Sequence, residues 1–370
     1  MLNPVLISYH YLRKSKPLCC VFDEMRKRNV TELMVDSGAF SAKHIGAEID
    51  LNTYNDFAQR CEDTGPVWNW VMLDVIGDSD QTLKNLDITV SRGLQPMPVL
   101  TADMSLDRAK DLCDINRSMC VAGGTDRYPG WKPTLMRRYW DAYEATDRKG
   151  LLHGLGFVNY PESFQCPLTS CDSTAFINGQ RFGSVHTYNA SRGWGSAYQW
   201  SEVVKKGSAG LPIELAEFVK RCGVRDFSDR QYIMAPGKDR GGSGGAFNTL
   251  SCTWAYMMTA QAARRHGLLI FLAASNAVPL VSMAVLSKLG ATDGSFFPYE
   301  ECQKEVARLS SALKRDAKSG AVALVDCMEE GCARISNRHL ASRGVPPVAT
   351  SLRPSRVLGY QPQASVPHSR

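Results

Sequence analysis

Residues 33–41 read LMVDSGAFS, a short stretch in which an apolar strand meets polar residues. Its first three residues are apolar, as in a buried strand, and they are followed at once by Asp36, Ser37 and Gly38. One interpretation is a helix N-cap, because Asp and Ser side chains accept hydrogen bonds from free helix amides. The other is a carboxylate presented at the carboxyl end of a parallel strand. This stretch alone leaves both open.

Seven further apolar runs resemble this one, and segments with helical periodicity separate several of them. Near-continuous apolar strands that alternate with helices are typical of a parallel sheet covered on both faces. Eight such units predict an α/β fold of the TIM (β/α)8 barrel type, with a doubly wound open sheet as the alternative. The runs are 5–12, 32–39, 69–77, 94–102, 118–124, 151–158, 168–175 and 268–275, and helices are expected within 54–65, 79–93, 105–117, 132–150 and 161–166.

A long segment separates the seventh run from the eighth. We therefore expect one catalytic domain over residues 1–330 with an insertion at about 177–266, before the last strand. The insertion contains Tyr188, Arg192 and Trp194, which interleave aromatic rings with a base. Such a surface suits stacking on bases and contact with phosphates, so these residues are predicted to contact nucleic acid. An aromatic-rich packed loop would show the same pattern.

The net charge of +6 originates at the end of the chain. Six arginines and no acidic residue follow Glu330, and the preceding residues carry equal numbers of basic and acidic side chains. Residues 331–370 are also rich in Pro, Ser and Ala, a composition typical of a disordered tail. A basic tail of this kind contacts phosphates nonspecifically or is simply solvated.

The overall composition is that of an ordinary globular protein, with 44% hydrophobic and 22% charged residues in 370. No apolar run reaches the roughly 18 residues of a membrane span. The first residues, MLNPVLISYHYLRK, have no basic leader before their apolar part. We therefore expect a cytoplasmic protein whose twelve cysteines are reduced and mostly buried.

Acidic residues and glycines follow several of the predicted strands. In a parallel barrel the carboxyl ends of the strands share one rim, so Asp36, Asp74 and Asp172 are expected to converge. Any single acid there could be a helix cap. Three acids, with glycines where a flat ligand needs close backbone approach, favour a binding or catalytic site. The glycines are Gly123, Gly124, Gly154 and Gly156.

Several other kinds of site are not indicated by the sequence. It contains no cluster with metal-ligand spacing, no GxSxG nucleophile elbow directly after a predicted strand and no dinucleotide fingerprint after the first strand. His153, His186 and His266 are far apart and are interpreted as ordinary polar residues. Paired carboxylates then favour nucleophilic attack at a sugar C1′, with a second acid transferring a proton.

The motif DSGAF at residues 36–40 resembles the DSGGF signature of the tRNA-guanine transglycosylase superfamily. VMLD, CVAGG, HGLGFV and TSCDSTAF follow in the order of that family's later motifs, and the resemblance covers roughly residues 30–180. It implies that Asp172 is the nucleophile that expels guanine from C1′ and that Asp36 is the general acid and base. The other positions to which it gives a substrate-binding role are Ser37, Phe40, Asp74, Gly123, Gly124, Gly154 and Gly156.

These implied contacts have a simple chemical sense. Phe40 would stack on the bound base, and Asp74 would accept hydrogen bonds from the guanine N1–H and amino group, since a carboxylate suits two adjacent donors. Ser37 would donate to the base or to the nucleophile. Backbone amides near Gly123 and Gly124 would contact the edge of the base.

Two departures from the family pattern bear on which branch of the family the chain resembles most. The zinc motif CxCxxC with a later histidine is absent, and the fourth strand lacks the glutamine-glycine pair that the tRNA enzymes use for the base. Both fit better with the branch encoded by phages and bacterial genomic islands, which inserts 7-deazaguanine bases into DNA. The resemblance then implies exchange of guanine in DNA for a free base such as 7-cyano-7-deazaguanine. The target base must leave the stack, so base flipping or a single-stranded substrate is expected.

The implied setting is the cytoplasm of a bacterial or phage-infected host cell, with no cofactor for the chemistry and with accessory DNA-modification proteins as possible partners. A tRNA-guanine transglycosylase or related RNA-modifying enzyme is the first alternative. A non-catalytic nucleic-acid-binding barrel is the second, although Asp36 and Asp172 are both present. A small-molecule glycosidase or aldolase on the same barrel is a further alternative and would need no basic tail.

Overall fold

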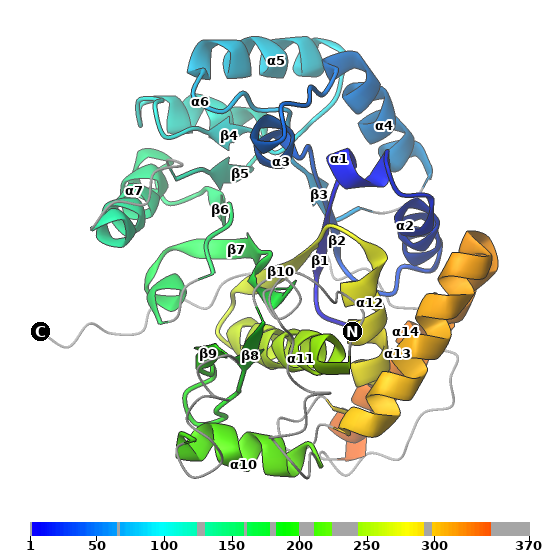
Figure 1. Cartoon of the computed structure of the whole chain (residues 1–370). Coiled ribbons are helices and arrows are strands. Elements are labelled where there is room, and N and C mark those ends of the chain that lie inside the picture. The colour runs from blue at the N-terminus through cyan, green and yellow to red at the C-terminus, as the bar shows by residue number, and fades with distance from the viewer. Residues whose placement is uncertain are drawn as a thin grey trace, which may run out of the picture.

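A parallel sheet of eight strands forms the centre of the molecule (Figure 1). The computed structural model describes residues 2–64, 67–123, 130–158, 161–177, 183–199, 211–223, 243–291 and 298–341. Each predicted apolar run contains one strand of this sheet. The strands are β1 (Val5–Ser8), β2 (Leu33–Asp36), β3 (Asn69–Trp70), β4 (Val99–Leu100), β5 (Ser118–Val121), β6 (Leu151–Gly154), β7 (Leu168–Ser173) and β10 (Leu269–Ala274).

The strands follow the chain order around a curled sheet. Their spatial order is β3-β2-β1-β10-β7-β6-β5-β4, so the last strand lies beside the first. The two ends of this row also meet, because Val71 just after β3 pairs with Met97 just before β4. The Met72 amide donates to the Met97 carbonyl at 3.0 Å, and the Met97 amide donates to the Trp70 carbonyl at 2.8 Å. This arrangement is compatible with a TIM-like barrel and differs from a doubly wound sheet.

Most of the helices lie outside the curled sheet (Figure 1). Local capping starts some of them; the carboxylate of Asp78, for example, accepts a hydrogen bond from the Gln81 amide at 2.9 Å at the start of α5. The helices are α1 (Tyr9–Leu12), α2 (Lys16–Arg28), α3 (Ala39–His44), α4 (Leu51–Thr64), α5 (Ser79–Ser91), α6 (Arg108–Ile115), α7 (Trp131–Ala145), α10 (Ile213–Arg221), α11 (Ser243–Arg265), α12 (Ala277–Lys288), α13 (Tyr299–Arg315) and α14 (Ala317–Ala341).

The connection from β6 to β7 differs from the others. The helix expected at 161–166 is only a short 3₁₀ helix, η1 (Glu162–Gln165), preceded by Pro161. A proline followed by so few helix-forming residues cannot build the several turns that a covering helix needs. In the described part of the chain, β6 and β7 are therefore joined without an α-helix.

Side-chain alternation on the strands sorts residues between the outside and the inside of the curled sheet. On β2, Leu33 and Val35 belong to a hydrophobic cluster that includes α2, whereas Met34 belongs to a second cluster with Phe271 of β10. Successive side chains of a strand point to opposite faces. Asp36 therefore shares the inner face with Met34, at the carboxyl end of the strand.

The segment expected as an insertion contains both peripheral and central parts. Strands β8 (Ser184–His186) and β9 (Ala197–Gln199) form a separate antiparallel pair, and α10 lies beyond them in Figure 1. Helix α11, at the end of the segment, packs against β10 and β8. The last part of the segment thus serves as a helix that covers the sheet.

The last described helix extends into the tail expected to lack structure. Helix α14 ends at Ala341, so the first residues of the 331–370 segment are helical and the predicted start of the tail is wrong. Gly331 helps to explain this, because a Cβ there would lie 2.6 Å from the Cβ of Ser287, and its absence lets α14 approach α12 closely. Residues 342–370 lie outside the described part of the chain.

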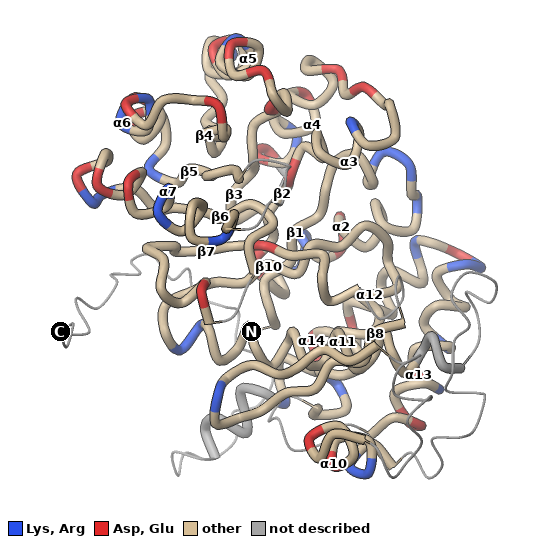
Figure 2. Tube along the Cα trace, turned by 60° about the vertical axis from the view of Figure 1, so that its left-hand side comes forward, with Lys and Arg blue, Asp and Glu red and all other residues tan. Residues whose placement is uncertain are grey.

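Three features bear on the expected cellular setting: the cysteines, the helices and the charged residues. All twelve cysteines are free thiols, and none is exposed. No helix within the described ranges is both long and apolar enough to cross a membrane. Charged residues lie largely along outer helices such as α5, α6 and α10 (Figure 2). The cytoplasmic location stays a prediction.

Candidate active site at the carboxyl ends of the strands

Three carboxylates gather at the carboxyl ends of the strands. Asp36 ends β2, Asp74 follows β3 and Asp172 lies near the end of β7. The pKa of Asp36 is raised to about 7, mainly by burial and then by the neighbouring charges of Asp74 and Asp172. Burial also raises the pKa of the Cys120 thiol on β5, and all three carboxylates add to this effect. The three acids therefore lie close enough together for their charges to act on the same neighbouring groups.

Asp36 is the last residue of β2, and Gly38 rather than Asp36 is the N-cap of α3. Its Oδ2 accepts a hydrogen bond from the Gly38 amide at 3.0 Å, and Oγ of Ser37 accepts one from the Ala39 amide at 3.2 Å; both bonds span two residues and form local turns just before α3. Asp36 also lies opposite Ser8 of β1 on the inner face of the sheet. The hydrogen bond from the Gly38 amide therefore orients the Asp36 carboxylate at the carboxyl end of the strand.

Asp74 is held by the loop around it. Its side chain is 7% exposed, and burial raises its pKa to about 6. On one side, the Asn85 side chain of α5 donates to the Leu73 carbonyl at 3.0 Å. On the other side, the Val75 amide donates to Oγ1 of Thr82 at 2.8 Å. Bonds to α5 on both sides give Asp74 a fixed position.

Asp172 has the most directly fixed carboxylate of the three. Its Oδ1 accepts a hydrogen bond from the Gly156 amide at 2.7 Å and lies 3.2 Å from Nε2 of His153. The other ring nitrogen of His153 lies 2.9 Å from Oγ of Ser170. Both contacts of Asp172 fall on one oxygen, and both partners belong to β6 or the residues just after it.

His153 is expected from the sequence to be an ordinary polar residue, and no local pattern indicates a role for Ser8. Both are buried beside the acids, and the Ser8 hydroxyl has no hydrogen-bond partner in the described part of the chain. The signal that identifies them is strand alternation. His153 pairs with Ser170 across β6 and β7, and Asp172 is two residues further on the same face.

Phe40 lies outside the hydrophobic core. It is 55% exposed, and its ring contacts the His44 ring with centroids 4.1 Å apart. The backbone carbonyl of Phe40 also lies 2.9 Å from Nδ1 of His44, one turn later in α3. Phe40 is therefore not a core residue, and its stacking on a base stays a prediction.

The glycines near the site are explained in part by helix packing. A Cβ on Gly123 would lie 3.0 Å from Leu135, and one on Gly154 would lie 3.0 Å from Leu168 and Tyr139. Leu135 and Tyr139 belong to α7, so the missing side chains face the helical layer. Gly156 instead contributes its amide to Asp172. A substrate-binding role for these three stays a prediction, and Gly124 lies outside the described residues.

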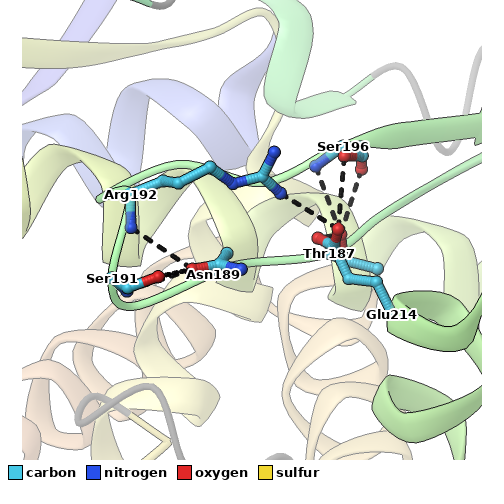
Figure 3. Close-up of polar contacts among 6 residues, drawn as sticks. All are labelled: Thr187, Asn189, Ser191, Arg192, Ser196 and Glu214. Carbon is cyan, nitrogen blue, oxygen red and sulfur yellow. Dashed lines mark hydrogen bonds and ion pairs between the residues drawn. The ribbon is translucent and has the colours of Figure 1, made fainter.

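Arg192 is engaged within the protein (Figure 3). Its Nη2 donates to Oε2 of Glu214 on α10 at 3.0 Å, and Thr187 donates to the other carboxylate oxygen at 2.6 Å. The Asn189 side chain closes the loop by accepting hydrogen bonds from the amides of Ser191 and Arg192 at 3.0 and 3.2 Å. This network joins the loop between β8 and β9 to α10.

The two aromatic residues of the same pattern also have partners in the fold. The Tyr188 ring meets Trp254 of α11 edge-on at 6.0 Å, and the Trp194 ring lies 6.1 Å from Phe164 of η1. Packing therefore accounts for the aromatic and basic pattern. Contact of these residues with nucleic acid stays a prediction.

Among the described residues, no group of three or more His, Cys, Asp or Glu side chains is placed to hold a metal ion. No protein-family model, curated protein or solved structure matched the chain. Functional assignment therefore rests on the residues and their geometry.

Proposed function

We propose that the chain is a transglycosylase that exchanges guanine in DNA for a 7-deazaguanine base, on a (β/α)8 barrel with an insertion before its last strand. The observation that carries the proposal is the difference between two carboxylates at one mouth. Asp36 has a pKa raised to about 7, whereas Asp172 is held at one oxygen by the Gly156 amide and His153. Two acids with different environments suit a proton carrier and a nucleophile.

The first half of the reaction uses these two groups together. Oδ2 of Asp172 attacks C1′ of the target nucleotide, the C1′–N9 bond breaks, and its electron pair leaves with guanine. Protonated Asp36 gives its proton to the departing base. Because a carboxyl with a pKa near 7 is partly protonated at neutral pH, Asp36 supplies this proton without a cofactor.

The second half reverses the first with a different base. N9 of the incoming 7-deazaguanine attacks C1′ of the aspartyl-glycosyl intermediate, and its proton passes to the carboxylate of Asp36. The ester bond to Asp172 breaks, and the carboxylate is regenerated. Two successive displacements retain the configuration at C1′.

Asp74 supports recognition of guanine. A buried carboxylate accepts hydrogen bonds from N1–H and the exocyclic amino group, which guanine and 7-deazaguanine bases both carry. Adenine has no donor at N1 and would leave the carboxylate unpaired in a site where Asp74 is 7% exposed. Asp74 thus favours both bases of the exchange over adenine.

The burial of the acids also bears on the form of the substrate. Asp74 and Asp172 are 7% and 8% exposed, so a base inside a duplex does not reach them. The target nucleotide must be flipped out or single-stranded. A tRNA-guanine transglycosylase would use the same acids, so the substrate has to be decided by experiment.

The test is product analysis with matched substrates. The protein is incubated with guanine-containing DNA, or separately with tRNA, together with 7-cyano-7-deazaguanine, and the nucleic acid is digested and analysed by mass spectrometry. We expect a deazaguanine deoxynucleoside that is absent with Asp172→Asn. The same product only in tRNA would assign the protein to RNA modification. No product in either would favour a non-catalytic binding role.

A further inference from the structure

A group of exposed cations and aromatic rings lies next to Asp36. This rim cluster consists of Arg13 and Lys14 at the end of α1, and Phe40, Lys43 and His44 on α3. All five side chains are exposed. Figure 2 shows basic segments of the chain beside α3. No local pattern in the sequence identifies this cluster, since its residues come from two separate segments.

The two helices of the rim cluster are in direct contact at the site. The His10 amide of α1 donates to the Ser37 carbonyl at 3.3 Å, and Tyr11 donates from its hydroxyl to Oγ of Ser41 at 3.2 Å. A Cβ on Gly38 would also lie 2.5 Å from the Cβ of His10. The two parts of the rim cluster are therefore joined by contacts that begin one residue after Asp36.

The cations of this surface bind neutral groups. Arg13 donates to the Glu48 carbonyl at 2.8 Å, Lys43 donates to the Ile76 carbonyl at 2.6 Å, and Nζ of Lys14 lies 3.1 Å from His10. His10 is a neutral partner, because burial and then the charges of Lys14 and Arg13 lower its pKa.

Some cations elsewhere in the described ranges are paired with acids, whereas Arg117 and Arg138 donate to backbone carbonyls as the rim cations do. Arg28, Arg92, Arg192, Arg264 and Lys288 each form an ion pair with a carboxylate. Within the same ranges, no ion pair involves Arg13, Lys14 or Lys43. Three cations without acidic partners create a local positive potential beside an acidic mouth, and phosphate is the ligand that suits such a surface.

The aromatic rings add a second feature of nucleic-acid surfaces. Phe40 and His44 form a contacting pair of exposed rings on α3, and single-stranded DNA binds where cations track the backbone and rings stack on bases. Lys43 reaches the Ile76 carbonyl, two residues beyond Asp74, so the surface extends from α1 to the loop that holds Asp74. A strand that crosses it has its phosphates beside the mouth.

We propose that the rim cluster binds the phosphates that flank the target nucleotide in single-stranded DNA. The proposal rests on the proposed function, because it places the strand so that the target base enters the mouth between Asp36 and Asp172. It assigns this contact to α1 and α3, whereas Arg192 of the β8–β9 loop is already paired with Glu214.

The test measures DNA binding separately from base exchange. The variant Arg13→Gln/Lys14→Gln/Lys43→Gln removes three charges and keeps groups that donate hydrogen bonds. The control Arg108→Gln/Arg137→Gln/Arg148→Gln removes three exposed charges from α6, α7 and the turn after α7. Binding of a labelled single-stranded oligonucleotide is followed by fluorescence anisotropy over a range of salt concentrations, with the same sequence as RNA in parallel.

We expect the rim variant to bind DNA roughly tenfold more weakly or worse at low salt, with a salt slope smaller by about 2, since each phosphate contact on a single strand contributes about 0.7. The control should bind as the wild type does. Unchanged binding of the rim variant, or equal loss in both variants, would overturn the proposal. Preferential binding of RNA through the same residues would also overturn it.

The result of the DNA-binding measurement is independent of the base-exchange assay. If the wild type exchanges no base but the rim variant loses DNA binding, the proposed function fails and the rim cluster stands as a DNA-binding surface. If the wild type exchanges bases and the rim variant does so with unchanged KM for DNA, the rim cluster fails and the proposed function stands. Circular dichroism of both triple variants confirms that they fold.

Discussion

The β6–β7 side and the β2–β3 side of the site hold the same residue type in different ways. On the β6–β7 side, Asp172 is tied at Oδ1 by the Gly156 amide and His153. On the β2–β3 side, burial raises the pKa of Asp36 to about 7 and that of Asp74 to about 6. The comparison teaches that burial dominates the environment of Asp36 and Asp74, whereas two neighbours at a single oxygen distinguish Asp172.

The strongest test of this comparison removes the nucleophile proposed for the β6–β7 side. Asp172→Asn should lower base exchange by about 10⁴-fold or more, because no covalent intermediate forms. The fold should persist, since Oδ1 of asparagine still accepts from the Gly156 amide. Mass spectrometry of digested DNA measures the exchange, and thermal melting checks the fold. Exchange within tenfold of the wild type would remove Asp172 from this role.

Asp36→Asn tests the other side and adds a pH signature. Exchange should fall by about 10² to 10⁴-fold with loss of the proton carrier. Because the folded pKa of Asp36 is raised to about 7, the folded state binds more protons than the unfolded state between about pH 4 and 7, and the wild type loses stability as pH rises through this window.

The Asp36→Asn variant should lack most of the loss of stability that the wild type shows as pH rises. It should therefore be more stable than the wild type at pH 8, by on the order of 2 to 4 kcal/mol. Urea unfolding at pH 5 and pH 8 measures the difference. An equal pH dependence of wild type and variant would show that the carboxyl of Asp36 titrates normally.

Two glycines allow the same comparison for the backbone. Gly38, beside Asp36, has φ of +84°, and a Cβ there would collide with Ser8 and His10. Gly156, beside Asp172, has φ of +63° and open space at the Cβ position. Gly38→Ala should destabilise the protein by about 3 kcal/mol and Gly156→Ala by about 1 kcal/mol. Denaturant unfolding measures both, and similar losses would contradict the difference in packing.

Among these variants, His153→Phe should have the smallest effect. It changes only the β6–β7 side of the site. It removes a contact to Asp172 but keeps a buried ring, so kcat should fall about 10-fold with KM for DNA unchanged. A purely structural role would instead lower the fraction of folded protein and leave kcat per folded molecule unaltered. Steady-state kinetics, corrected for active protein, separate the two.

The sequence is sufficient for features that depend on local pattern and general topology. The apolar runs locate all eight strands, and parallel strands bring their carboxyl ends to one edge, so the convergence of Asp36, Asp74 and Asp172 follows. Their chemical roles, and the guanine exchange, stay proposals.

Features that depend on tertiary contacts are absent from the pattern. The contact of His153 with Asp172 depends on the register of β6 and β7, which shifts between Leu152 and His153. The partner of Arg192 is Glu214, on a helix that no local signal links to the β8–β9 loop. The extension of α14 beyond residue 330 depends on its close packing against α12, which composition does not reveal.

The junction between β3 and β4 gives the site an unequal rigidity. Only the Val71–Met97 pair joins these two strands in the described structure, whereas four residue pairs join β10 to β7. Local opening of the ring therefore costs least at this junction. Asp74 lies three residues beyond Val71, while Asp172 belongs to the continuous part. In the proposed base exchange, a pocket built this way would widen around a larger substituent on the incoming base while Asp172, the proposed nucleophile, stays in register.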